Sequence, residues 1–343
     1  MNQQEMNEII QNVLLSNLGI DTKAVQQQVV TEALSGSGVE ISGFGKIKIN
    51  DGFHINNNLE VLDLSDRNID DITISNVNLH NVNFSNTTFK KVIFKNIEIL
   101  SANLDGTQFI ECEFINAHFD GLNQISLDGT LFDSVKFVNS NLRNFQIEDL
   151  KINKSEFKNT KISNLEIESL EFNQCVFLNS LISYLEDGVV KFNECNLDGV
   201  KIENVENESL EFIRTKYNAF YFEYIDSKNL KMNQSELNAG YIESDKCEII
   251  SQESDINSVE IRVESGGKIE GGKIYNSDCS DFYGDKLFFN KMDVKSSDFG
   301  GNSSIDELSI ADSKFMYSEI NDEFEKVDNY TNCELQYCSD ELE

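Results

Sequence analysis

Proline is absent from this sequence of 343 residues, although an average usage of about 5% would give roughly 17. Because proline cannot donate a backbone hydrogen bond, a chain that never uses it indicates hydrogen-bonded structure almost throughout. Tryptophan is absent as well, and phenylalanine supplies most of the aromatic residues.

Long apolar runs are also missing. None approaches ~18 residues, the length that a membrane-spanning helix needs. The first ten residues, MNQQEMNEII, contain neither the basic segment nor the apolar segment of a signal peptide. We therefore expect a cytoplasmic protein that does not bind membranes.

Positive charge is scarce. The chain has 28 Lys and Arg residues against 60 Asp and Glu residues, which gives a formal net charge of −32. Such a surface repels nucleic acids, so we expect no direct nucleic-acid binding. It favours basic partners, including proteins that normally hold DNA. Solubility alone is the alternative explanation of this charge.

What the sequence has in abundance is a five-residue period. Twelve successive positions are large and apolar: Leu64, Ile69, Ile74, Leu79, Phe84, Phe89, Phe94, Ile99, Leu104, Phe109, Phe114 and Phe119. Two places before most of them stands a small or β-branched residue, and two places after them the turn formers Asn, Asp and Gly recur. A period of five is typical of neither a helix, at 3.6, nor a strand, at 2.

The period continues after a shift of frame. The frame slips by three residues after Phe119 and resumes at Leu127, and the period then runs to Ile242. The breaks within this second stretch are Asp187, Asn207 and Ser227. Beyond residue 242 the period becomes patchy.

The segments ANLDG (102–106), VNLHN (77–81) and CNLDG (195–199) resemble the motif of the pentapeptide-repeat family. That motif is a small residue, Asp or Asn, Leu or Phe, and two turn residues. The resemblance implies an all-β solenoid, a right-handed, four-sided (quadrilateral) parallel β-helix. In that fold each pentapeptide forms one side and four of them form one coil, so residues 20 apart should stack about 4.8 Å apart. Repeats this short cannot bury a core alone and must stack.

The ends of the chain depart from the repeat. Residues 1–36 show the apolar spacing and capping signals of two short helices, which we expect to cap the solenoid or to dock onto a partner. The β-helix is expected over 37–337, regular over 62–242 and irregular over 243–288. An acidic tail is expected over 338–343.

The sequence shows no constellation of catalytic residues. The histidines, His54, His80 and His118, offer neither metal-ligand spacing nor a nucleophile–base pair. Four cysteines occupy the small inward position, which indicates packing rather than nucleophilic chemistry: Cys112, Cys175, Cys195 and Cys333. We therefore expect no enzyme activity, no cofactor and no bound metal. A hydrolase that uses paired acids, with Glu206 among them, is the enzymatic alternative.

The register of four pentapeptides per coil predicts which charges stack. On one face the signs alternate, as a ladder of salt bridges requires: Lys151, Glu171, Lys191, Glu211 and Lys231. The adjacent face stacks like charges instead, and it also holds the three breaks in the apolar pattern. On this face the residues two places before each central position are large and apolar, and we expect them to fill the core: Leu165, Leu185, Val205 and Ile225.

We name this second set the acidic stripe: Glu166, Glu186, Asp187, Glu206 and Asp226. Because like charges placed opposite each other destabilise a sheet, the stripe is predicted to bind a basic partner. A cation site and a merely solvated face are the alternatives.

The resemblance also implies a function. Pentapeptide-repeat proteins of the quinolone-resistance group act as DNA mimics on gyrase and topoisomerase IV. The first hypothesis is therefore a non-enzymatic acidic DNA mimic, bacterial or from a phage, that engages a DNA-binding protein such as a type II topoisomerase. Family analogy allows a homodimer. The alternative is a structural or adaptor component of a viral, secretory or defence-related assembly, with the solenoid as spacer and the N-terminal helices for docking.

Overall fold

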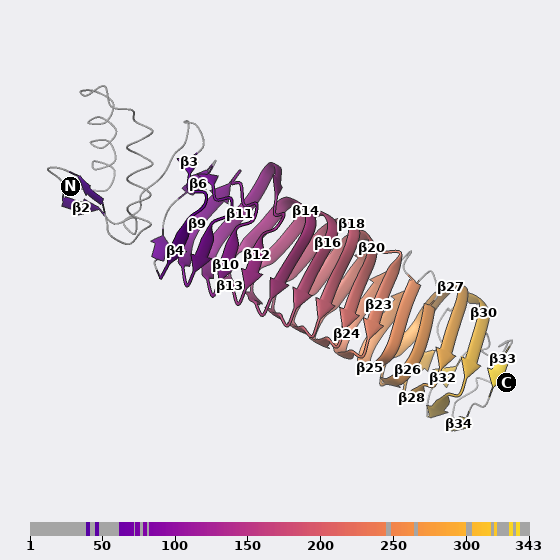
Figure 1. The fold of residues 1–343 in the computed structure, drawn as a ribbon. Coiled ribbons are helices and arrows are strands. Elements are labelled where there is room, and N and C mark those ends of the chain that lie inside the picture. Colours follow the sequence, from indigo (N-terminus) through magenta and orange to yellow (C-terminus); the bar gives the residue numbers. More distant parts are fainter. Residues whose placement is uncertain are drawn as a thin grey trace. The chain divides into compact units, whose positions relative to one another are not determined.

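The computed structural model describes residues 39–41, 45–47, 62–71, 73–75, 78–80, 82–244, 248–263, 267–299, 304–316, 319–320, 329–331 and 334–336. The chain divides into two compact units, Met1–Lys161 and Ile162–Glu343. All regular elements of the described residues are strands (Figure 1). The predicted helical pair at 1–36 and the acidic tail at 338–343 lie outside the described residues.

Unit 1 contains mostly short strands. They are β1 (Val39–Ile41), β2 (Gly45–Ile47), β3 (Leu62–Asp63), β4 (Asn68–Asp70), β5 (Thr73–Ser75), β6 (Asn78–His80), β7 (Val82–Asn83), β8 (Thr88–Lys90), β9 (Ile93–Leu100), β10 (Gln108–Ile110), β11 (Glu113–Ser126), β12 (Leu131–Asp133), β13 (Lys136–Val138), β14 (Asn141–Asn153) and β15 (Glu156–Lys158). β1 and β2 pair antiparallel in a sheet of their own. From β3 onward the pairings are parallel, as in a β-solenoid.

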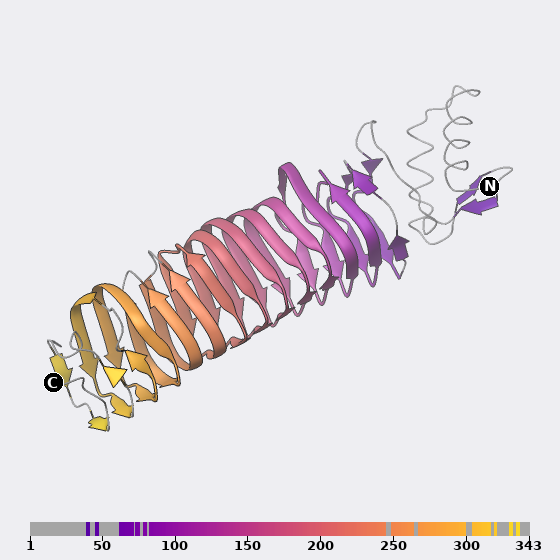
Figure 2. The same ribbon diagram turned by 180° about the vertical axis from the view of Figure 1, so that it is seen from behind.

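Unit 2 continues with the same kind of strand. They are β16 (Lys161–Asn173), β17 (Val176–Leu178), β18 (Leu181–Asn193), β19 (Asn196–Asp198), β20 (Lys201–Ile213), β21 (Lys216–Asn218), β22 (Tyr221–Ile225), β23 (Asn229–Asn233), β24 (Glu236–Ser244), β25 (Glu248–Val263), β26 (Gly267–Tyr275), β27 (Asp278–Asn290), β28 (Asp293–Lys295), β29 (Asp298–Phe299), β30 (Ser304–Ala311), β31 (Lys314–Met316), β32 (Glu319–Ile320), β33 (Asn329–Thr331) and β34 (Glu334–Gln336). Figure 2 shows these strands from behind. Their pairing is parallel throughout, so this unit is also a parallel β-solenoid.

The register confirms the predicted coil length over the regular part of each unit. Thr88 pairs with Gln108 in unit 1, and Lys201 pairs with Tyr221 in unit 2, so the partner lies four pentapeptides further along the chain. The predicted slip of frame is confirmed too, because Phe109 pairs with Phe132 and not with Gly129, where a regular coil would place its partner.

The coils of unit 2 become shorter after β23. Asn229 pairs with Glu248, where a regular coil would give Ile249. Ile249 in turn pairs with Gly267, where a regular coil would give Ile269. The irregular stretch that the sequence indicates beyond residue 242 thus begins with coils that have lost one or two residues. The regular step returns where Gly267 pairs with Leu287, and one residue is gained where Asp293 pairs with Lys314.

The three extra residues of the frame slip are accommodated within β11. Its pairing with β14 shifts between Asp120 and Ile125. Gly121 lies at this shift, and a Cβ atom there would come within 2.2 Å of the Asn144 carbonyl oxygen. The close approach of two backbones therefore requires glycine at this place.

The five-residue period places one large apolar side chain inside each segment, and rings one coil apart stack. In unit 1 the Phe89 and Phe109 rings lie 5.2 Å apart at 6°, and Phe109 and Phe132 lie 5.1 Å apart at 9°. In unit 2 Phe192 stacks between Phe172 and Phe212 at 4.9 Å and 5.0 Å. Buried aromatic pairs of this kind stabilise beyond their burial of apolar area.

The small residues that precede each large inward side chain by two places form hydrogen bonds of their own. The Thr107 hydroxyl donates to the Phe84 carbonyl at 2.8 Å, and the Thr215 hydroxyl donates to the Phe192 carbonyl at 2.9 Å. A buried hydroxyl needs such a partner. Thr, Ser and Cys therefore fit this second buried column because each can donate to a backbone carbonyl.

The turn formers occupy corners with left-handed backbone. Asparagine is frequent among the residues with positive φ, for example Asn116, Asn139 and Asn159, because it tolerates this region better than other residues that carry a Cβ. Asparagines of successive coils also bond to each other: Asn159 Nδ2 donates to Asn139 Oδ1 at 3.1 Å.

Candidate protein-binding face

The acidic stripe lies on consecutive coils of unit 2. Glu166 belongs to β16, Glu186 and Asp187 to β18, and Glu206 to β20, while Asp226 directly follows β22. Glu186 is the register partner of Glu206. Four of the five side chains are exposed, and that of Asp226 is half-buried.

Three members of the stripe have no internal partner. Among the described residues, the side chains of Glu186, Asp187 and Glu206 make no hydrogen bond or ion pair. Like charges that face each other across two strands destabilise a sheet by roughly a few tenths of a kcal/mol or more. The repulsion between Glu186 and Glu206 thus destabilises the folded chain, and solvent, salt or a cationic partner would weaken that repulsion.

Other acidic side chains of unit 2 are neutralised from within. The Lys191 ammonium lies 3.3 Å from the Glu211 carboxylate, and the Lys231 ammonium lies 2.8 Å from it, which confirms this part of the predicted ladder. Burial alone would raise the pKa of Glu211, but the Lys231 hydrogen bond and the charges of both lysines outweigh it, so the pKa is lowered. Lys201 likewise bridges Glu203 and Glu223 at 2.7 Å and 2.9 Å, and these bonds raise its pKa.

The core beneath the stripe is filled as the sequence indicated. Leu165, Leu185, Val205 and Ile225 are all buried. Two of the three polar breaks stay inside: Ser227 donates to Asn207 Oδ1 at 2.5 Å, and Asn207 is only 6% exposed. The Asn207 Nδ2 group is buried without a partner among the described residues.

The third break faces outward. Asp187 has a φ of +63° and an exposed side chain. The next residue, Gly188, has a φ of +32°, and a Cβ there would come within 2.1 Å of the Ile167 carbonyl oxygen. Two successive left-handed residues turn the Asp187 carboxylate away from the core and onto the acidic stripe.

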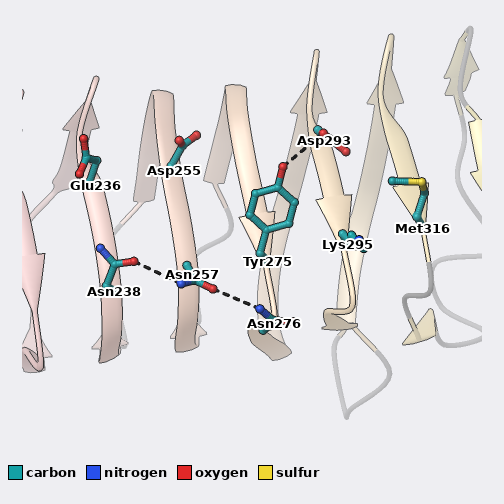
Figure 3. A pocket seen from close by; sticks show the side chains of 9 residues that line it. All are labelled: Glu236, Asn238, Asp255, Asn257, Tyr275, Asn276, Asp293, Lys295 and Met316. Carbon is teal, nitrogen blue, oxygen red and sulfur yellow. Dashed lines mark hydrogen bonds between the residues drawn. The ribbon is translucent and has the colours of Figure 1, made fainter.

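A second polar feature of unit 2 is an open cleft of about 610 Å³ (Figure 3). An amide row runs along it, in which Asn257 donates to Asn238 and Asn276 donates to Asn257, both at 3.3 Å. The Tyr275 hydroxyl donates to Asp293 Oδ2 at 3.3 Å, while Asp293 Oδ1 is buried without a partner among the described residues. This lining offers hydrogen-bonding groups, among them the Tyr275 hydroxyl with the Asp293 carboxylate beside it.

The five-residue period does not predict this cleft. It lies over 236–316, where the five-residue period is patchy and coil lengths change. The only sequence signal is the recurrence of asparagine at Asn238, Asn257 and Asn276, which follows the shortened coils rather than the regular step.

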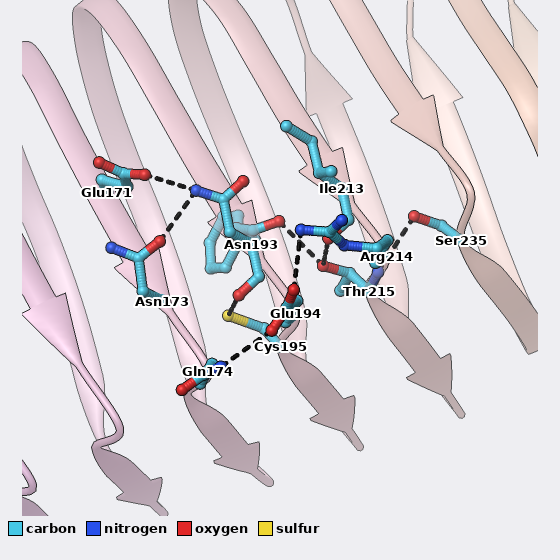
Figure 4. A network of polar contacts seen from close by, with 11 residues as sticks. Glu171, Asn173, Gln174, Asn193, Glu194, Cys195, Ile213, Arg214, Thr215 and Ser235 are labelled. Atoms are coloured by element: carbon cyan, nitrogen blue, oxygen red, sulfur yellow. Dashed lines mark hydrogen bonds and ion pairs between the residues drawn. The ribbon is translucent and has the colours of Figure 1, made fainter.

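A network of polar contacts on another part of unit 2 joins neighbouring coils (Figure 4). Asn193 Nδ2 donates to Asn173 Oδ1 at 2.9 Å, Gln174 donates to Glu194 at 2.9 Å, and Arg214 pairs with Glu194 at 2.7 Å. Each contact links residues one coil apart, so this network stabilises stacking rather than forming a ligand site.

The cysteines in the described part of the chain are buried thiols. Cys112, Cys175 and Cys195 lie in the small inward column, as predicted, and Cys279 is buried as well. Burial raises the pKa of Cys112 to about 11. A hydrogen bond with the Cys175 thiol, together with burial, raises the pKa of Cys195. These thiols are poor nucleophiles at neutral pH. Cys333 lies outside the described residues.

Within the described ranges, no group of three or more His, Cys, Asp or Glu side chains is arranged to hold a metal ion. The same residues contain no helix whose length and apolarity would let it cross a membrane. His118 is exposed and contacts Asn141 at 3.0 Å through its ring nitrogen Nδ1.

No model of a known protein family matches the chain, and no curated protein matches its sequence. Some solved structures share features of its fold. A tailspike protein double mutant of E. coli bacteriophage HK620, in complex with a pentasaccharide, is 8% identical, with a TM-score of 0.36, over 94% of this chain and 75% of that one. HetL, a pentapeptide-repeat protein involved in heterocyst differentiation regulation in Nostoc sp. strain PCC 7120, is 9% identical, with a TM-score of 0.23, over 79% of this chain and 87% of that one.

QnrB1, a plasmid-mediated fluoroquinolone resistance protein, is 12% identical, with a TM-score of 0.20, over 69% of this chain and 88% of that one. At TM-scores this low the likenesses decide neither the family nor the activity of this chain. What is established is the fold: a parallel β-solenoid in each unit, with an acidic stripe on unit 2.

Proposed function

We propose that this protein is a non-enzymatic binding protein whose acidic stripe engages a basic, DNA-binding protein. Acting as an acidic DNA mimic, it would occupy the surface that a type II topoisomerase such as gyrase offers to DNA. Such a partner places its action in the cytoplasm of a bacterium.

The proposal includes a four-sided coil of the pentapeptide-repeat type. Its support is the combination of a five-residue inward period with a register in which Thr88 pairs with Gln108 and Lys201 with Tyr221, which makes four segments per coil. Consecutive inward rings also meet nearly edge-on: Phe84 and Phe89 at 76°, and Phe89 and Phe94 at 72°. Rings on adjacent sides of a square would meet in this way.

The observation that carries the proposal is the pair Glu186 and Glu206. These exposed carboxylates are register partners on adjacent strands, and neither has an ion pair among the described residues. Elsewhere in unit 2 the register places lysine opposite glutamate, as at Lys191 and Glu211. A cationic partner would supply at the stripe the neutralisation that the fold supplies elsewhere.

The spacing of charge supports mimicry of a nucleic acid. Three successive coils each expose two carboxylates: Glu166 and Glu168, Glu186 and Asp187, and Glu206 and Glu208, of which Glu208 forms an ion pair with Lys228 at 3.2 Å. At about 4.8 Å per coil this makes one carboxylate per about 2.4 Å of the solenoid axis. Duplex DNA carries one phosphate charge per about 1.7 Å. The two charge densities are comparable.

The experiment is DNA supercoiling by purified bacterial gyrase, with this protein added at low and at moderate salt. We expect inhibition that weakens as salt screens the charges. The double variant Glu186→Lys plus Glu206→Lys should not inhibit. No inhibition by the folded protein at high micromolar concentration would remove gyrase as the partner, and full inhibition by the charge-reversed variant would remove the stripe as the site.

A matched control is available in unit 1. Asp70→Lys plus Asp71→Lys changes the net charge by the same amount away from the stripe. The backbone already holds lysine one coil away, since Lys90 is the register partner of Asp70 and Lys91 repeats the left-handed backbone of Asp71 with a φ of 54° against 57°. The control places lysines opposite each other at residues 70 and 90, as the charge-reversed variant does at residues 186 and 206, so the two variants are matched in local repulsion as well as in net charge. This control should inhibit gyrase almost as well as the unaltered protein.

A further inference from the structure

Three tyrosines stand out on the surface of unit 2. Among the described residues, the large apolar side chains that are exposed are Tyr184, Tyr221 and Tyr224, with exposed fractions of 49%, 54% and 55%. Tyr184 lies two residues before Glu186 in β18, and Tyr224 lies two residues before Asp226. The rings of Tyr184 and Tyr224 therefore border the acidic stripe, whereas Tyr221 lies before the corner at Tyr224, opposite Lys201.

Two of these tyrosines occupy backbone positions that disfavour them. Tyr184 and Tyr224 both have a φ of 55°, in the left-handed region. Asn164 and Asn204 fill the same corner one coil before each of them, with φ values of 56° and 54°. A bulky residue in this region is strained, whereas asparagine tolerates it. Local stability does not explain a tyrosine here, and strain of this sort clusters at functional sites.

The strands that carry Tyr221 and Tyr241 show what a tyrosine ring of this fold can hold. Tyr241 is the register partner of Tyr221, and the Arg262 guanidinium lies over the Tyr241 ring, 5.9 Å from its centroid. Arg262 also pairs with Glu260 at 2.8 Å. A tyrosine ring and a carboxylate together therefore hold one guanidinium within the solenoid.

One coil earlier this arrangement lacks its arginine. In the next coil the register partner of Tyr241 is Glu260, and Arg262 lies two places after Glu260. In the same way the register partner of Tyr221 is Tyr241, and Glu243 lies two places after Tyr241. A carboxylate thus stands where Arg262 stands in the next coil. Beside Tyr184, the carboxylate of Glu186 and that of its register partner Glu206 have no internal cation among the described residues.

We propose that Tyr184, Tyr221 and Tyr224 form, with the acidic stripe, a docking surface for an arginine-bearing segment of the basic partner. Guanidinium groups stack on the exposed rings and form ion pairs with the adjacent carboxylates. Lysine satisfies only the second requirement well, because its ammonium is compact and strongly hydrated, whereas guanidinium is planar and weakly hydrated. Tyrosine also suits an interface because it gives a large contact area for little loss of conformational freedom.

This inference rests on the proposed function, since it names the chemistry of the partner that the acidic stripe would bind. It adds a preference that charge alone does not produce. A purely electrostatic surface binds arginine and lysine peptides of equal length about equally.

The test uses the full chain and two fluorescent peptides, ten arginines and ten lysines, with binding measured by anisotropy at several salt concentrations. The key variant is Tyr184→Asn plus Tyr224→Asn. It leaves every charge in place and inserts the residue that Asn164 and Asn204 already provide in this corner, so it should fold at least as stably as the unaltered chain. Thermal unfolding checks that the variant is folded.

We expect the unaltered protein to bind the arginine peptide about tenfold more tightly than the lysine peptide, in line with two partly exposed cation–π contacts. The Asn variant should keep its affinity for the lysine peptide and lose most of the preference. Equal affinity of the unaltered protein for both peptides, or an unchanged preference in the Asn variant, overturns the tyrosine surface and leaves the acidic stripe standing. Affinity for both peptides that survives Glu186→Lys plus Glu206→Lys overturns the acidic stripe instead.

Discussion

Glu186 and Glu206 lie directly opposite each other on neighbouring parallel strands, both exposed and both without a cationic partner among the described residues. The next register pair of two charged residues along the same strands does the reverse, since Lys191 pairs with Glu211 there. The same two strands thus contain one register pair of opposite charges, which neutralise each other, and one register pair of like charges, which repel each other. This contrast makes the stripe a surface that folding alone does not favour.

The first prediction concerns the effect of the facing carboxylates Glu186 and Glu206 on the stability of the fold. Glu186→Gln removes one of two facing charges, so it should raise the free energy of unfolding by a few tenths of a kcal/mol. The gain should shrink at high salt, where the repulsion is screened. Urea unfolding followed by circular dichroism at low and high NaCl measures both effects. A loss of stability at low salt would show that Glu186 has a favourable role in the fold.

The second prediction concerns the ion pairs that Glu211 forms with Lys191 and Lys231. Glu211→Gln should destabilise the protein by about 0.5–1 kcal/mol at pH 7, because both partner lysines are partly exposed and such pairs are weak. The pKa of Glu211 is lowered in the folded state from a usual value of 4.5. Its stabilising effect is therefore present above that value and is lost as the pH falls through the folded-state pKa.

The difference in unfolding free energy between the unaltered protein and Glu211→Gln, measured from pH 7 down to pH 3, checks this sign. It should be largest near neutrality and approach zero in acid. A difference that grew in acid would mean that the carboxylate is not stabilised by Lys191 and Lys231.

The third prediction concerns the polar pair in the core. Ser227→Ala removes the donor to Asn207 and leaves a buried amide without partners, so it should cost about 1–3 kcal/mol. Asn207→Leu combined with Ser227→Ala removes both polar groups, and we expect it to be less destabilising than Ser227→Ala alone. A double-mutant cycle by chemical denaturation measures the coupling. Strict additivity would indicate that the two side chains do not depend on each other.

The fourth prediction concerns the aromatic column of unit 1. Phe109 is buried between the rings of Phe89 and Phe132. Phe109→Ala should cost about 3–5 kcal/mol, since it leaves a cavity in a core that cannot collapse without breaking the register. Phe109→Leu keeps most of the volume and should cost much less. Equal effects of the two substitutions in thermal unfolding would contradict the role of the filled column.

Much of the fold was predictable because the five-residue period specifies which side chains face inward. Every inward position from Leu64 to Phe119 is buried, and the slip of frame after Phe119 appears as the pairing of Phe109 with Phe132. The alternating charges of Lys191, Glu211 and Lys231 followed from the register by arithmetic, and the ion pairs are present.

The remainder could not be predicted because the period says nothing about outward positions or about coils of another length. It does not show that Asp187 faces out while Asn207 and Ser227 stay in, since that choice depends on the left-handed backbone at Asp187 and Gly188. It does not single out Tyr184 and Tyr224 at corners that asparagine usually occupies. The cleft beside Asp293 depends on the shortened coils after β23, which the patchy period beyond residue 242 conceals.

The most direct test of the central claim is a competition for gyrase between this protein and DNA. A fluorescent DNA duplex is bound to gyrase, the protein is titrated in, and the anisotropy of the duplex is recorded at several salt concentrations. We predict that the unaltered protein and the Asp70→Lys plus Asp71→Lys control displace the duplex completely, and that Glu186→Lys plus Glu206→Lys does not. A protein that leaves the duplex bound at every concentration, or a charge-reversed variant that displaces it equally well, would contradict DNA mimicry by the acidic stripe.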